Sequence, residues 1–301
     1  MKTYRANGKL LISGEYLVLE GALSLAIPTK KGQSLHFLPK ETSFLDWQSV
    51  DENGNKWLEV KFSTKDLEII NATDFNKAVK LQNILKKAIE MTALTSAYNG
   101  QVITQLEFPL EWGLGSSSTL ISCISQWLQI DPFDLHFKVS NGSAYDIACA
   151  GNNSAITYQL MNKSPKTNLV NWKPAFIDSL FFVYLNQKQN SENEVNRFIK
   201  KSKPKIDQTH IQQISNITKS IIECSTLNQF MNLIDIHEEI MGEILHLPTI
   251  KNKNFSDYNG SIKSLGAWGG DFILATGNEE DRNYFKNKGL LSIIDFKDMI
   301  K

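Results

Sequence analysis

The sequence predicts a globular protein that mixes α-helices with β-strands and has room for two domains. Its 301 residues, 42% of them hydrophobic, are enough to build two cores of ordinary size. Extended segments bounded by turn residues dominate the first 62 residues, as expected of strands. From residue 76 onward, apolar residues recur at helical spacing in several stretches, with strand-like runs between them.

The first 62 residues are predicted to form antiparallel strands. Two turn dipeptides, Asn7-Gly8 and Asn53-Gly54, separate segments of extended character, and the second of them predicts a hairpin. The six expected strands are Thr3–Ala6, Lys9–Ile12, Ala22–Pro28, Lys31–Leu38, Phe44–Val50 and Lys56–Phe62.

Later elements follow from apolar periodicity and from helix-start and helix-stop residues. The expected helices are Asn76–Ala93, Leu120–Ile130, a short one from Pro132 through Phe137, one beginning at Ser191, and then Ile214–Cys224, Phe230–Ile244 and Glu279–Asn287. The expected strands are Gln101–Phe108, Ala155–Leu160, Leu180–Leu185, Phe272–Thr276 and Leu290–Phe296. His237 lies on an apolar helical stripe and is interpreted as a packed side chain, not a catalyst. The polar run Met161–Asn171 is the best candidate for a domain boundary by composition.

Charge and cysteine content exclude several classes of function. The chain has 32 basic and 32 acidic residues, so no global basic field attracts nucleic acid or a membrane surface. Cys123, Cys149 and Cys224 are scattered among apolar neighbours, which is typical of core thiols in a reducing compartment. Met1–Ile12 contains no long apolar run, and no later stretch reaches the length of a membrane span. We therefore expect a cytoplasmic monomer or homodimer that acts on a small molecule.

The most informative stretch is Pro109–Thr119, in which a glycine-rich turn leads directly into a predicted helix. Glycines on either side of one apolar residue allow a tight turn, and three hydroxyls then fall on the first helical turn. Unpaired N–H groups and the helix dipole favour an anion at such a position. The alternative is a serine-capped helix after a glycine turn. The candidate phosphate-binding residues are Gly113, Leu114, Gly115, Ser116, Ser117 and Ser118.

Three further elements suit phosphoryl transfer when they are combined with this loop. Lys9 can supply positive charge and Asp146 a carboxylate. Within the loop itself, Ser117 or Ser118 can supply a hydroxyl for Mg²⁺. The stretch Lys263–Asp271 carries glycines that permit close approach of the backbone to a ligand, namely Gly266, Gly269 and Gly270. Each element also has an ordinary explanation: an exposed strand lysine, a helix N-cap and a β-turn.

Taken together, these motifs resemble those of the GHMP kinase superfamily, which includes galactokinase, homoserine kinase, mevalonate kinase and phosphomevalonate kinase. The resemblance covers essentially the whole chain. Four segments carry it: Asn7–Tyr16, Pro109–Ser117, Gly142–Ala148 and Gly266–Asp271. The third segment is most similar to a bacterial subgroup with a Gly-Tyr-Asp-Ile-Ala motif, and the last ends in Gly-Gly-Asp, as in phosphomevalonate kinases.

The resemblance implies a two-domain α+β fold. The N-terminal domain, residues 1–165, would contain an unusual left-handed β-α-β unit and would bind ATP. The C-terminal domain, residues 166–301, would be ferredoxin-like. ATP and Mg²⁺ are the implied cofactors, and the implied reaction is transfer of the γ-phosphoryl group to a hydroxyl or phosphate acceptor, of mevalonate or phosphomevalonate type.

The resemblance also assigns roles to individual residues. Asp146 would be the catalytic carboxylate, with Lys9 as its charged neighbour. Glu15, Tyr16 and Ser143 would lie near the acceptor. The residues that would bind ATP are Gly113, Leu114, Gly115, Ser116, Ser117, Ser118, Gly266, Gly269 and Gly270, with Ser117 on the metal ion.

Several residues depart from the family pattern. Trp268 stands where glycine is usual, Leu265 where Ser or Thr is common, and Ala144 replaces a frequent glycine. No acidic residue matches the glutamate that mevalonate kinases use as a Mg²⁺ ligand, since Asp131 and Asp134 have the wrong spacing. Two alternatives to a kinase therefore stay open: a diphosphomevalonate decarboxylase, and a degenerate member that binds a nucleotide or metabolite without turnover.

Overall fold

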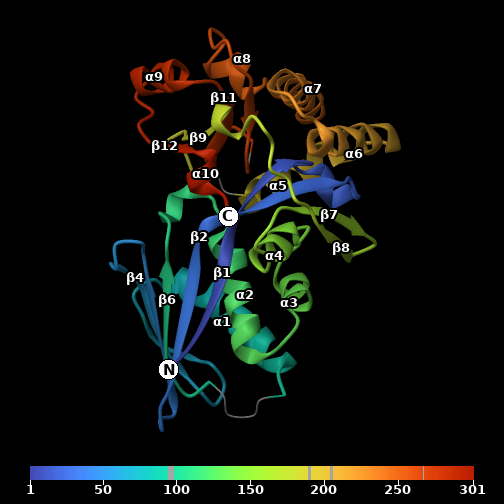
Figure 1. The fold of residues 1–301 in the computed structure, drawn as a ribbon. Helices are drawn as coiled ribbons and strands as arrows, with labels where there is room; N and C mark the ends of the chain where they lie inside the picture. Colours follow the sequence, from blue (N-terminus) through green and yellow to red (C-terminus); the bar gives the residue numbers. More distant parts are fainter. Residues whose placement is uncertain (94–97, 189–190, 204–205, 267) are drawn as a thin grey trace. The chain divides into compact units, whose positions relative to one another are not determined.

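A computed structural model describes residues 1–93, 98–188, 191–203, 206–266 and 268–301 of the chain (Figure 1). Ala267, inside the predicted Gly266–Asp271 loop, lies outside the described residues. The chain forms two compact units. Unit 1 comprises residues 1–8, 31–110 and 114–151, and unit 2 comprises residues 9–30, 111–113 and 152–301. The long strands β1 (Lys2–Ser13) and β2 (Ser24–Pro39) contribute residues to both units.

Unit 1 is built on a mixed β-sheet. Its strand order is β5 (Ile69–Ala72), β4 (Lys56–Ser63), β3 (Phe44–Val50), β6 (Gly100–Leu106) and then the second half of β2. Strand β3 runs parallel to β6, whereas β4 and β5 are antiparallel to their neighbours. The predicted hairpin at Asn53-Gly54 is confirmed as the turn between β3 and β4.

The described residues of unit 1 also form the α-helices α1 (Phe75–Met91), α2 (Ser116–Leu128), α3 (Pro132–Val139) and α4 (Tyr145–Ala150). Helix α2 packs against each of the other three. The apolar stripe predicted for α1 is confirmed, because Leu81, Leu85 and Ala88 are buried. The core that these residues join also contains Trp47 from β3 and Trp127 from α2.

Unit 2 contains an antiparallel sheet in the order β10 (Ile262–Ser264), β11 (Phe272–Thr276), β9 (Leu180–Tyr184) and β12 (Ile293–Asp295). Its helices are α5 (Ser191–Lys201), α6 (Gln208–Glu223), α7 (Leu227–Leu245), α8 (Ile250–Asn254), α9 (Glu279–Asn287) and α10 (Phe296–Met299). Helices α6 and α7 lie side by side (Figure 1). The sequence of elements, one strand, helices, two strands, a helix and a strand, is the ferredoxin-like pattern that was expected.

The predicted turn at Asn7-Gly8 is wrong. Strand β1 runs through both residues without interruption, and the two segments expected from residues 22 to 38 form one strand, β2, which pairs with β1. Asn7 is buried, and its amide oxygen accepts a hydrogen bond from Arg5 Nη1 at 2.7 Å. Pairing with a long neighbouring strand has therefore overridden a local turn preference.

The polar run Met161–Asn171 forms a hairpin. Strands β7 (Ile156–Met161) and β8 (Ser164–Leu169) are antiparallel, and the turn residues Asn162 and Lys163 have φ values of 51° and 62°. Strand β8 ends the sheet order, where one partner is sufficient and polar residues and proline are tolerated. The domain boundary at residue 165 stays a prediction, as does the handedness of the β-α-β unit.

Composition also agrees with burial. Cys123 and Cys149 are buried free thiols and Cys224 is half-buried, which confirms the prediction that they pack as small side chains.

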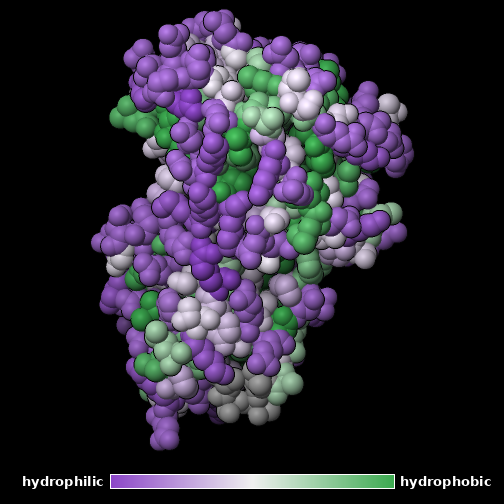
Figure 2. Space-filling view, in the orientation of Figure 1, coloured by the Kyte–Doolittle hydropathy of each residue, from purple (hydrophilic) through white to green (hydrophobic). Residues whose placement is uncertain are grey.

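The face in Figure 2 is mostly hydrophilic, with apolar side chains interrupted by polar ones. Within the described part of the chain, none of the helices combines the length and the apolar character needed to cross a membrane.

The close contact of β2 with β1 gives a test of the packing in unit 1. A methyl group at Gly32 would lie 2.1 Å from the Ala6 carbonyl oxygen, whereas one at Gly151 would lie 3.9 Å from its nearest neighbour, the Ile147 carbonyl oxygen. We expect Gly32→Ala to lower the free energy of unfolding in urea by about 1–3 kcal/mol. Gly151→Ala, the control, should change it by less than about 0.5 kcal/mol. Equal effects of the two substitutions would contradict the described packing.

Candidate active site

Helix α2 begins at the predicted phosphate-binding turn. Its N-cap residue is Gly115, in the left-handed conformation with φ 94°, and no side chain caps the helix. The first N–H to bond back into the helix is that of Thr119, which donates to the Gly115 carbonyl oxygen at 2.9 Å. The N–H groups of the first turn are therefore available to a ligand, and the positive end of the helix dipole lies there. The serine-cap alternative is wrong, because the capping position holds glycine.

The hydroxyl groups of Ser117 and Ser118 differ in burial and in hydrogen bonding. Ser118 is buried, and its hydroxyl donates to the Gly115 carbonyl oxygen at 2.8 Å. Thr119, the next residue, donates to the Gln33 side chain at 2.6 Å and so joins the helix to β2. Ser117 is exposed at the helix entrance. Of the two serines considered for the metal ion, Ser117 is the one whose position suits a ligand.

Asp146 lies in the first turn of α4, in the same unit as α2. Its Oδ1 accepts a hydrogen bond from the Ile147 N–H at 3.0 Å, and the side chain is half-buried. The N-cap of α4 is Ala144, so the alternative that Asp146 is an N-cap is wrong. Ala144 has φ 65°, a conformation in which glycine avoids a cost of about 1–2 kcal/mol, which explains why glycine suits this position. Ser143 is buried immediately before it.

Lys9 and two glycine turns meet within unit 2. Lys9 is 7% exposed, and its Nζ donates to the Gly113 carbonyl oxygen at 3.1 Å, so it is not the exposed strand lysine of the ordinary explanation. The carboxylate of Asp271 lies against Gly113 and Gly266, where a Cβ would come within 2.3 and 3.1 Å of its Oδ2. Asp271 is buried and has φ 53°. In the sequence, Asp271 was noted only as the end of a Gly-Gly-Asp motif. That motif did not predict that the Asp271 carboxylate lies beside two glycine turns.

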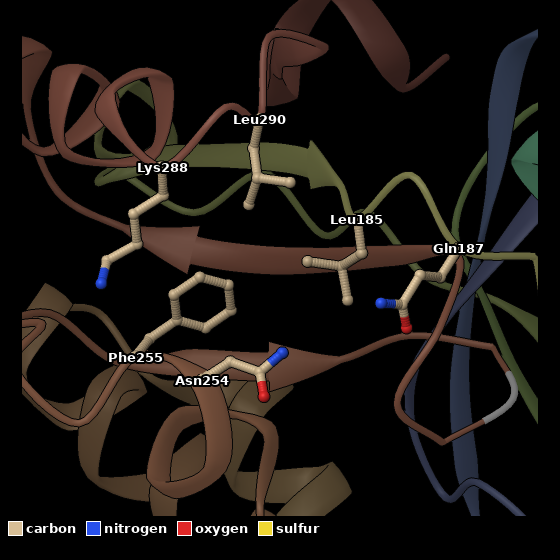
Figure 3. A pocket seen from close by; sticks show the side chains of 6 residues that line it. All are labelled: Leu185, Gln187, Asn254, Phe255, Lys288 and Leu290. Carbon is tan, nitrogen blue, oxygen red and sulfur yellow. The ribbon is translucent and has the colours of Figure 1, made fainter.

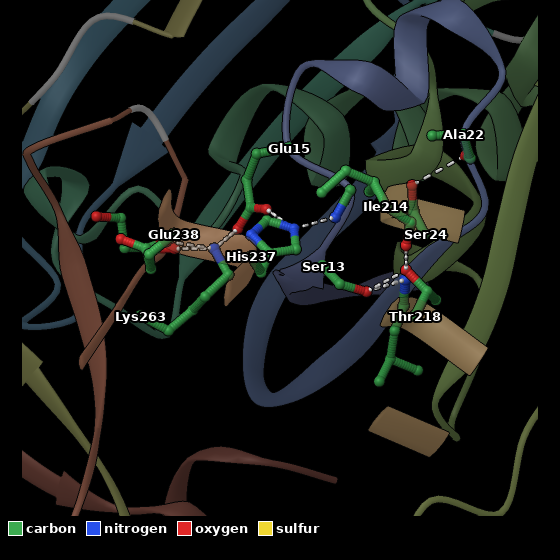
Figure 4. A network of polar contacts seen from close by, with 12 residues as sticks. Ser13, Glu15, Ala22, Ser24, Ile214, Thr218, His237, Glu238 and Lys263 are labelled. Carbon is green, nitrogen blue, oxygen red and sulfur yellow. Dashed lines mark hydrogen bonds and ion pairs between the residues drawn. The ribbon is translucent and has the colours of Figure 1, made fainter. Parts of the chain in front are cut away.

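Glu15 and Tyr16 are also buried in unit 2. Glu15 Oε1 lies 2.5 Å from the Nζ of Lys263, and Lys263 in turn contacts Glu238 Oε1 at 2.9 Å (Figure 4). His237 Nε2 accepts the Gly14 N–H at 3.1 Å and lies 3.3 Å from Glu15 Oε2. The hydroxyl of Tyr16 accepts a hydrogen bond from the Trp268 N–H at 3.0 Å. Sequence motifs indicated Glu15 and Tyr16, but they contained no signal for Lys263 and Glu238 as the charged groups of this cluster.

Burial controls the protonation of this cluster. Desolvation raises the pKa of both Glu15 and Glu238, and the ammonium group of Lys263 opposes that rise. Desolvation also tends to lower the pKa of Lys263, but the two carboxylates outweigh it and the pKa is raised. Burial and the nearby Lys263 hold the pKa of His237 well below its ordinary value. His237 is therefore neutral at pH 7 and is confirmed as a packed side chain.

Trp268 occupies the position where the family usually has glycine. Its side chain is buried, and the indole Nε1 donates to the Pro248 carbonyl oxygen at 3.3 Å. Both N–H groups of this residue, that of the backbone and that of the indole, thus have acceptors inside unit 2. Burial also raises the pKa of Tyr16, its partner, to about 12. The indole packs as a structural side chain in the interior of unit 2.

Metal ligands are sparse. In the ranges that the structure describes, no three side chains of His, Cys, Asp or Glu form a group that could hold a metal ion. Asp131 is explained by helix capping, because its Oδ1 accepts the N–H groups of Phe133 and Asp134 at 2.8 and 2.9 Å. A Mg²⁺ ion would fit only as it commonly does with nucleotides, through one or two protein groups and substrate phosphates.

A pocket of about 310 Å³ also lies in unit 2 (Figure 3). It is lined by Leu185, Gln187, Asn254, Phe255, Lys288 and Leu290, none of which was a predicted site residue. The Lys288 Nζ lies 3.5 Å from Asp257 Oδ1. The pocket adjoins the glycine loop through the Gln187 carbonyl oxygen, which accepts the Asp271 N–H at 2.7 Å.

The predicted site residues thus divide between the two units. Unit 1 holds Leu114, Gly115, Ser116, Ser117, Ser118, Ser143 and Asp146, and unit 2 holds Lys9, Glu15, Tyr16, Gly113, Gly266, Gly269 and Gly270. Within unit 1, the helices that carry Ser117 and Asp146 pack together. Within unit 2, Lys9 contacts Gly113, and Tyr16 contacts the glycine loop. The proximity of Lys9 to Asp146 stays a prediction.

Comparison with known proteins places this fold. No family model matches the sequence. No curated protein matches it closely enough to count as a relative. Solved structures do match over nearly the whole chain. Phosphomevalonate kinase of Streptococcus pneumoniae, in complex with phosphomevalonate and AMPPNP, superposes with a TM-score of 0.69 at 17% identity, covering 97% of this chain and 99% of that one.

Two further structures show the same similarity. Mevalonate kinase of Methanococcus jannaschii has a TM-score of 0.68 at 13% identity, with 95% of this chain and 94% of that chain covered. Lactococcus lactis galactokinase complexed with galactose has a TM-score of 0.68 at 12% identity, with coverage of 95% and 88%. The chain has the GHMP kinase fold. The predicted two-domain α+β architecture of GHMP kinases is thereby confirmed, and at these identities the similarity establishes the fold alone.

The two glycine turns of unit 2 give a test of the Asp271 contact. Gly113 and Gly269 have φ values of 64° and 83°, so alanine costs about 1–2 kcal/mol of backbone strain at either position. Only at Gly113 would the new methyl group also meet Asp271 Oδ2, since no described atom lies within 4 Å at Gly269. We expect Gly113→Ala to lower the free energy of unfolding by about 1–3 kcal/mol more than Gly269→Ala does. Equal losses in thermal unfolding would show that Asp271 does not occupy this position.

The neutral state of His237 predicts a pH dependence. Its pKa is lower in the folded chain than in the unfolded one, so unfolding takes up a proton as the pH falls below about 6.5. The stability that neutral His237 contributes is complete above that pH and is lost below it, by at most about 1.4 kcal/mol per pH unit. His237→Gln should remove this component. Parallel curves of unfolding free energy for wild type and variant between pH 6.5 and 5 would contradict a buried neutral imidazole.

Proposed function

We propose that this protein is an ATP-dependent small-molecule kinase that transfers the γ-phosphoryl group to a hydroxyl or phosphate acceptor, of mevalonate or phosphomevalonate type. The observation that carries the proposal is the entrance of α2, where a left-handed Gly115 leads into unpaired N–H groups beside an exposed Ser117. Backbone donors at a helix N-terminus suit a phosphate without requiring a positively charged side chain. Solved structures with this fold, one of them bound to AMPPNP, support the assignment of the anion as ATP.

The residues of the chain would divide the work of phosphoryl transfer. The turn Gly113–Ser118 would bind ATP phosphates through its backbone. Lys9, whose Nζ already bonds to the Gly113 carbonyl oxygen, would place positive charge beside that turn. Ser117 would be one of the few protein ligands of Mg²⁺, and the bound ion would neutralise charge on the transferred group. The resemblance to GHMP kinases also assigns Gly266, Gly269 and Gly270 to ATP binding.

Asp146 would orient or deprotonate the acceptor hydroxyl. It is half-buried in the first turn of α4, which packs against α2, so carboxylate and phosphate turn belong to neighbouring helices. Ser143, buried three residues earlier, would contact the acceptor. The choice of a mevalonate or phosphomevalonate acceptor is supported by the Gly-Gly-Asp ending of the Gly266–Asp271 segment and by the phosphomevalonate kinase among the matching structures.

A degenerate protein that binds without turnover is the alternative with a specific motivation, namely Trp268 and the absent glutamate ligand. Trp268 argues less for it than the sequence implied, because the indole is buried and bonded to the Pro248 carbonyl oxygen. A decarboxylase of diphosphomevalonate would share the fold and consume ATP, and release of CO₂ would distinguish it from a kinase.

The test is ADP release with Mg²⁺-ATP and a panel of acceptors: mevalonate, phosphomevalonate, diphosphomevalonate, homoserine and galactose. We expect turnover with one acceptor, and Asp146→Asn should lower kcat by about 100-fold or more, since positioned acid–base groups contribute that much. Asp134→Asn, an exposed carboxylate in the first turn of the neighbouring helix α3, is the matched control.

The outcomes separate the candidate functions. An Asp146→Asn enzyme within a few-fold of wild type would exclude the catalytic role of that carboxylate. CO₂ released with ADP from diphosphomevalonate would identify a decarboxylase. If no acceptor of the panel gives ADP release while calorimetry still detects ATP binding, the degenerate protein that binds without turnover would be favoured.

A further inference from the structure

Lys263 joins three segments of unit 2 that are far apart in the sequence. Its ammonium group has three donors, and each has an acceptor: Glu15 Oε1 at 2.5 Å, Glu238 Oε1 at 2.9 Å and the Ser264 carbonyl oxygen at 2.9 Å. Figure 4 shows the side chains of Glu15, Glu238 and Lys263 pointing toward one another. The three residues come from the turn after β1, from helix α7 and from β10, and β10 leads directly into the loop Leu265–Asp271.

A hydrogen bond to Tyr16 holds the same loop at a second position, Trp268. The N–H of Trp268 donates to the hydroxyl of Tyr16 at 3.0 Å, and the Tyr16 ring packs on Phe198 with centroids 5.1 Å apart. Tyr16 has φ 57°, an unfavourable conformation for a bulky residue that surrounding contacts must maintain. Adjacent residues, Glu15 and Tyr16, thus hold the loop at its base and near its middle.

Backbone hydrogen bonds also fix the two ends of the loop. The Leu265 N–H donates to the Phe272 carbonyl oxygen at 3.0 Å, and the Asp271 N–H donates to the Gln187 carbonyl oxygen at 2.7 Å. Glu15 and Tyr16 are only 2% and 8% exposed, so little of either side chain is left to meet a dissolved acceptor. Glu15 Oε1 contacts Lys263, Glu15 Oε2 lies 3.3 Å from His237 Nε2, and the Tyr16 hydroxyl contacts the Trp268 N–H, all within unit 2.

We propose that Glu15 and Tyr16 are positioning residues for the Leu265–Asp271 loop, acting through Lys263 and Trp268, and that they do not contact the acceptor. Glu238, on helix α7, also positions Lys263 through its ion pair with the ammonium group. Removal of Lys263 leaves two buried carboxylates without a counter-charge, so the cluster must break or admit water. Removal of the Glu15 carboxylate leaves Lys263 paired with Glu238 but ends the ion pair between the turn after β1 and β10. The consequence for ATP affinity rests on the proposed function of this loop; the structural role does not.

Hydrogen exchange tests the structural role without any ligand. We expect Glu15→Gln, Tyr16→Phe and Lys263→Met each to speed exchange of the loop amides, those of Leu265, Trp268 and Asp271, by about tenfold. Two controls remove polar groups close by in unit 2. Tyr258→Phe removes a buried hydroxyl that donates to the Thr276 carbonyl oxygen at 2.7 Å, and Asp235→Asn alters the α7 carboxylate that accepts from Ser261 Oγ at 2.8 Å.

The controls should leave exchange of those three amides unchanged. Circular dichroism identifies any variant that does not fold, and Glu238→Gln, which keeps a hydrogen-bond acceptor for Lys263, then replaces Lys263→Met. Unchanged exchange of the loop amides in folded Glu15→Gln and Tyr16→Phe would overturn the proposal, and so would equal acceleration in the controls.

Calorimetric titration with Mg²⁺-ATP, in the absence of acceptor, gives the second readout. Positioning through a shared ion pair predicts that Glu15→Gln and Lys263→Met each weaken ATP binding by about tenfold and that the double variant is no weaker than the worse single one. Normal ATP binding in Glu15→Gln, combined with a raised KM for the acceptor, would instead place Glu15 at the acceptor. A wild-type protein that binds no ATP would refute the proposed function, while the exchange experiment would still decide the positioning role.

Discussion

The arrangement of unit 2 depends most on the ion pairs that the ammonium group of Lys263 forms with Glu15 and Glu238. This ammonium group is fully buried between two carboxylates, and such a charge is tolerated only when every donor has a partner. Its partners come from positions 248 and 25 residues away, so the folded chain must bring the turn after β1, helix α7 and strand β10 together before the charge is compensated. A buried ion cluster of this kind favours one arrangement of the three segments over others, because alternatives leave a charge unpaired.

Backbone strain occurs at three residues of the predicted site segments. Tyr16, Ala144 and Asp271 have positive φ although none of them is glycine. Conformations of this kind persist only where the surrounding structure enforces them, and they often mark functional sites. For Asp271, the enforcing contacts are hydrogen bonds of its own N–H and carbonyl groups to Gln187 and Leu185. The glycines at positions 113 and 266 follow from this carboxylate, since a Cβ would collide with it or crowd it.

The fold is shared with proteins that are only 12–17% identical to this chain. Burial patterns explain how so little identity suffices, because a strand or helix requires apolar residues at the right period and not particular ones. The acceptor is a different matter. Solved structures with this fold include a mevalonate kinase, a phosphomevalonate kinase and a galactokinase, and specificity among such molecules resides in a few side chains of the site.

Local chemistry in the sequence determined the elements and the candidate site. Asp131-Pro132 begins α3, Asn53-Gly54 turns the β3–β4 hairpin, and the glycine turn enters α2, as predicted, because caps and turns depend on neighbouring residues. Tertiary structure decided what no local pattern encodes. It drew Asn7-Gly8 into a long strand, buried Lys9 against Gly113, and paired Glu15 with Lys263. These outcomes depend on partners far away in the chain, and a short window of sequence contains no information about which distant group will compensate a buried charge.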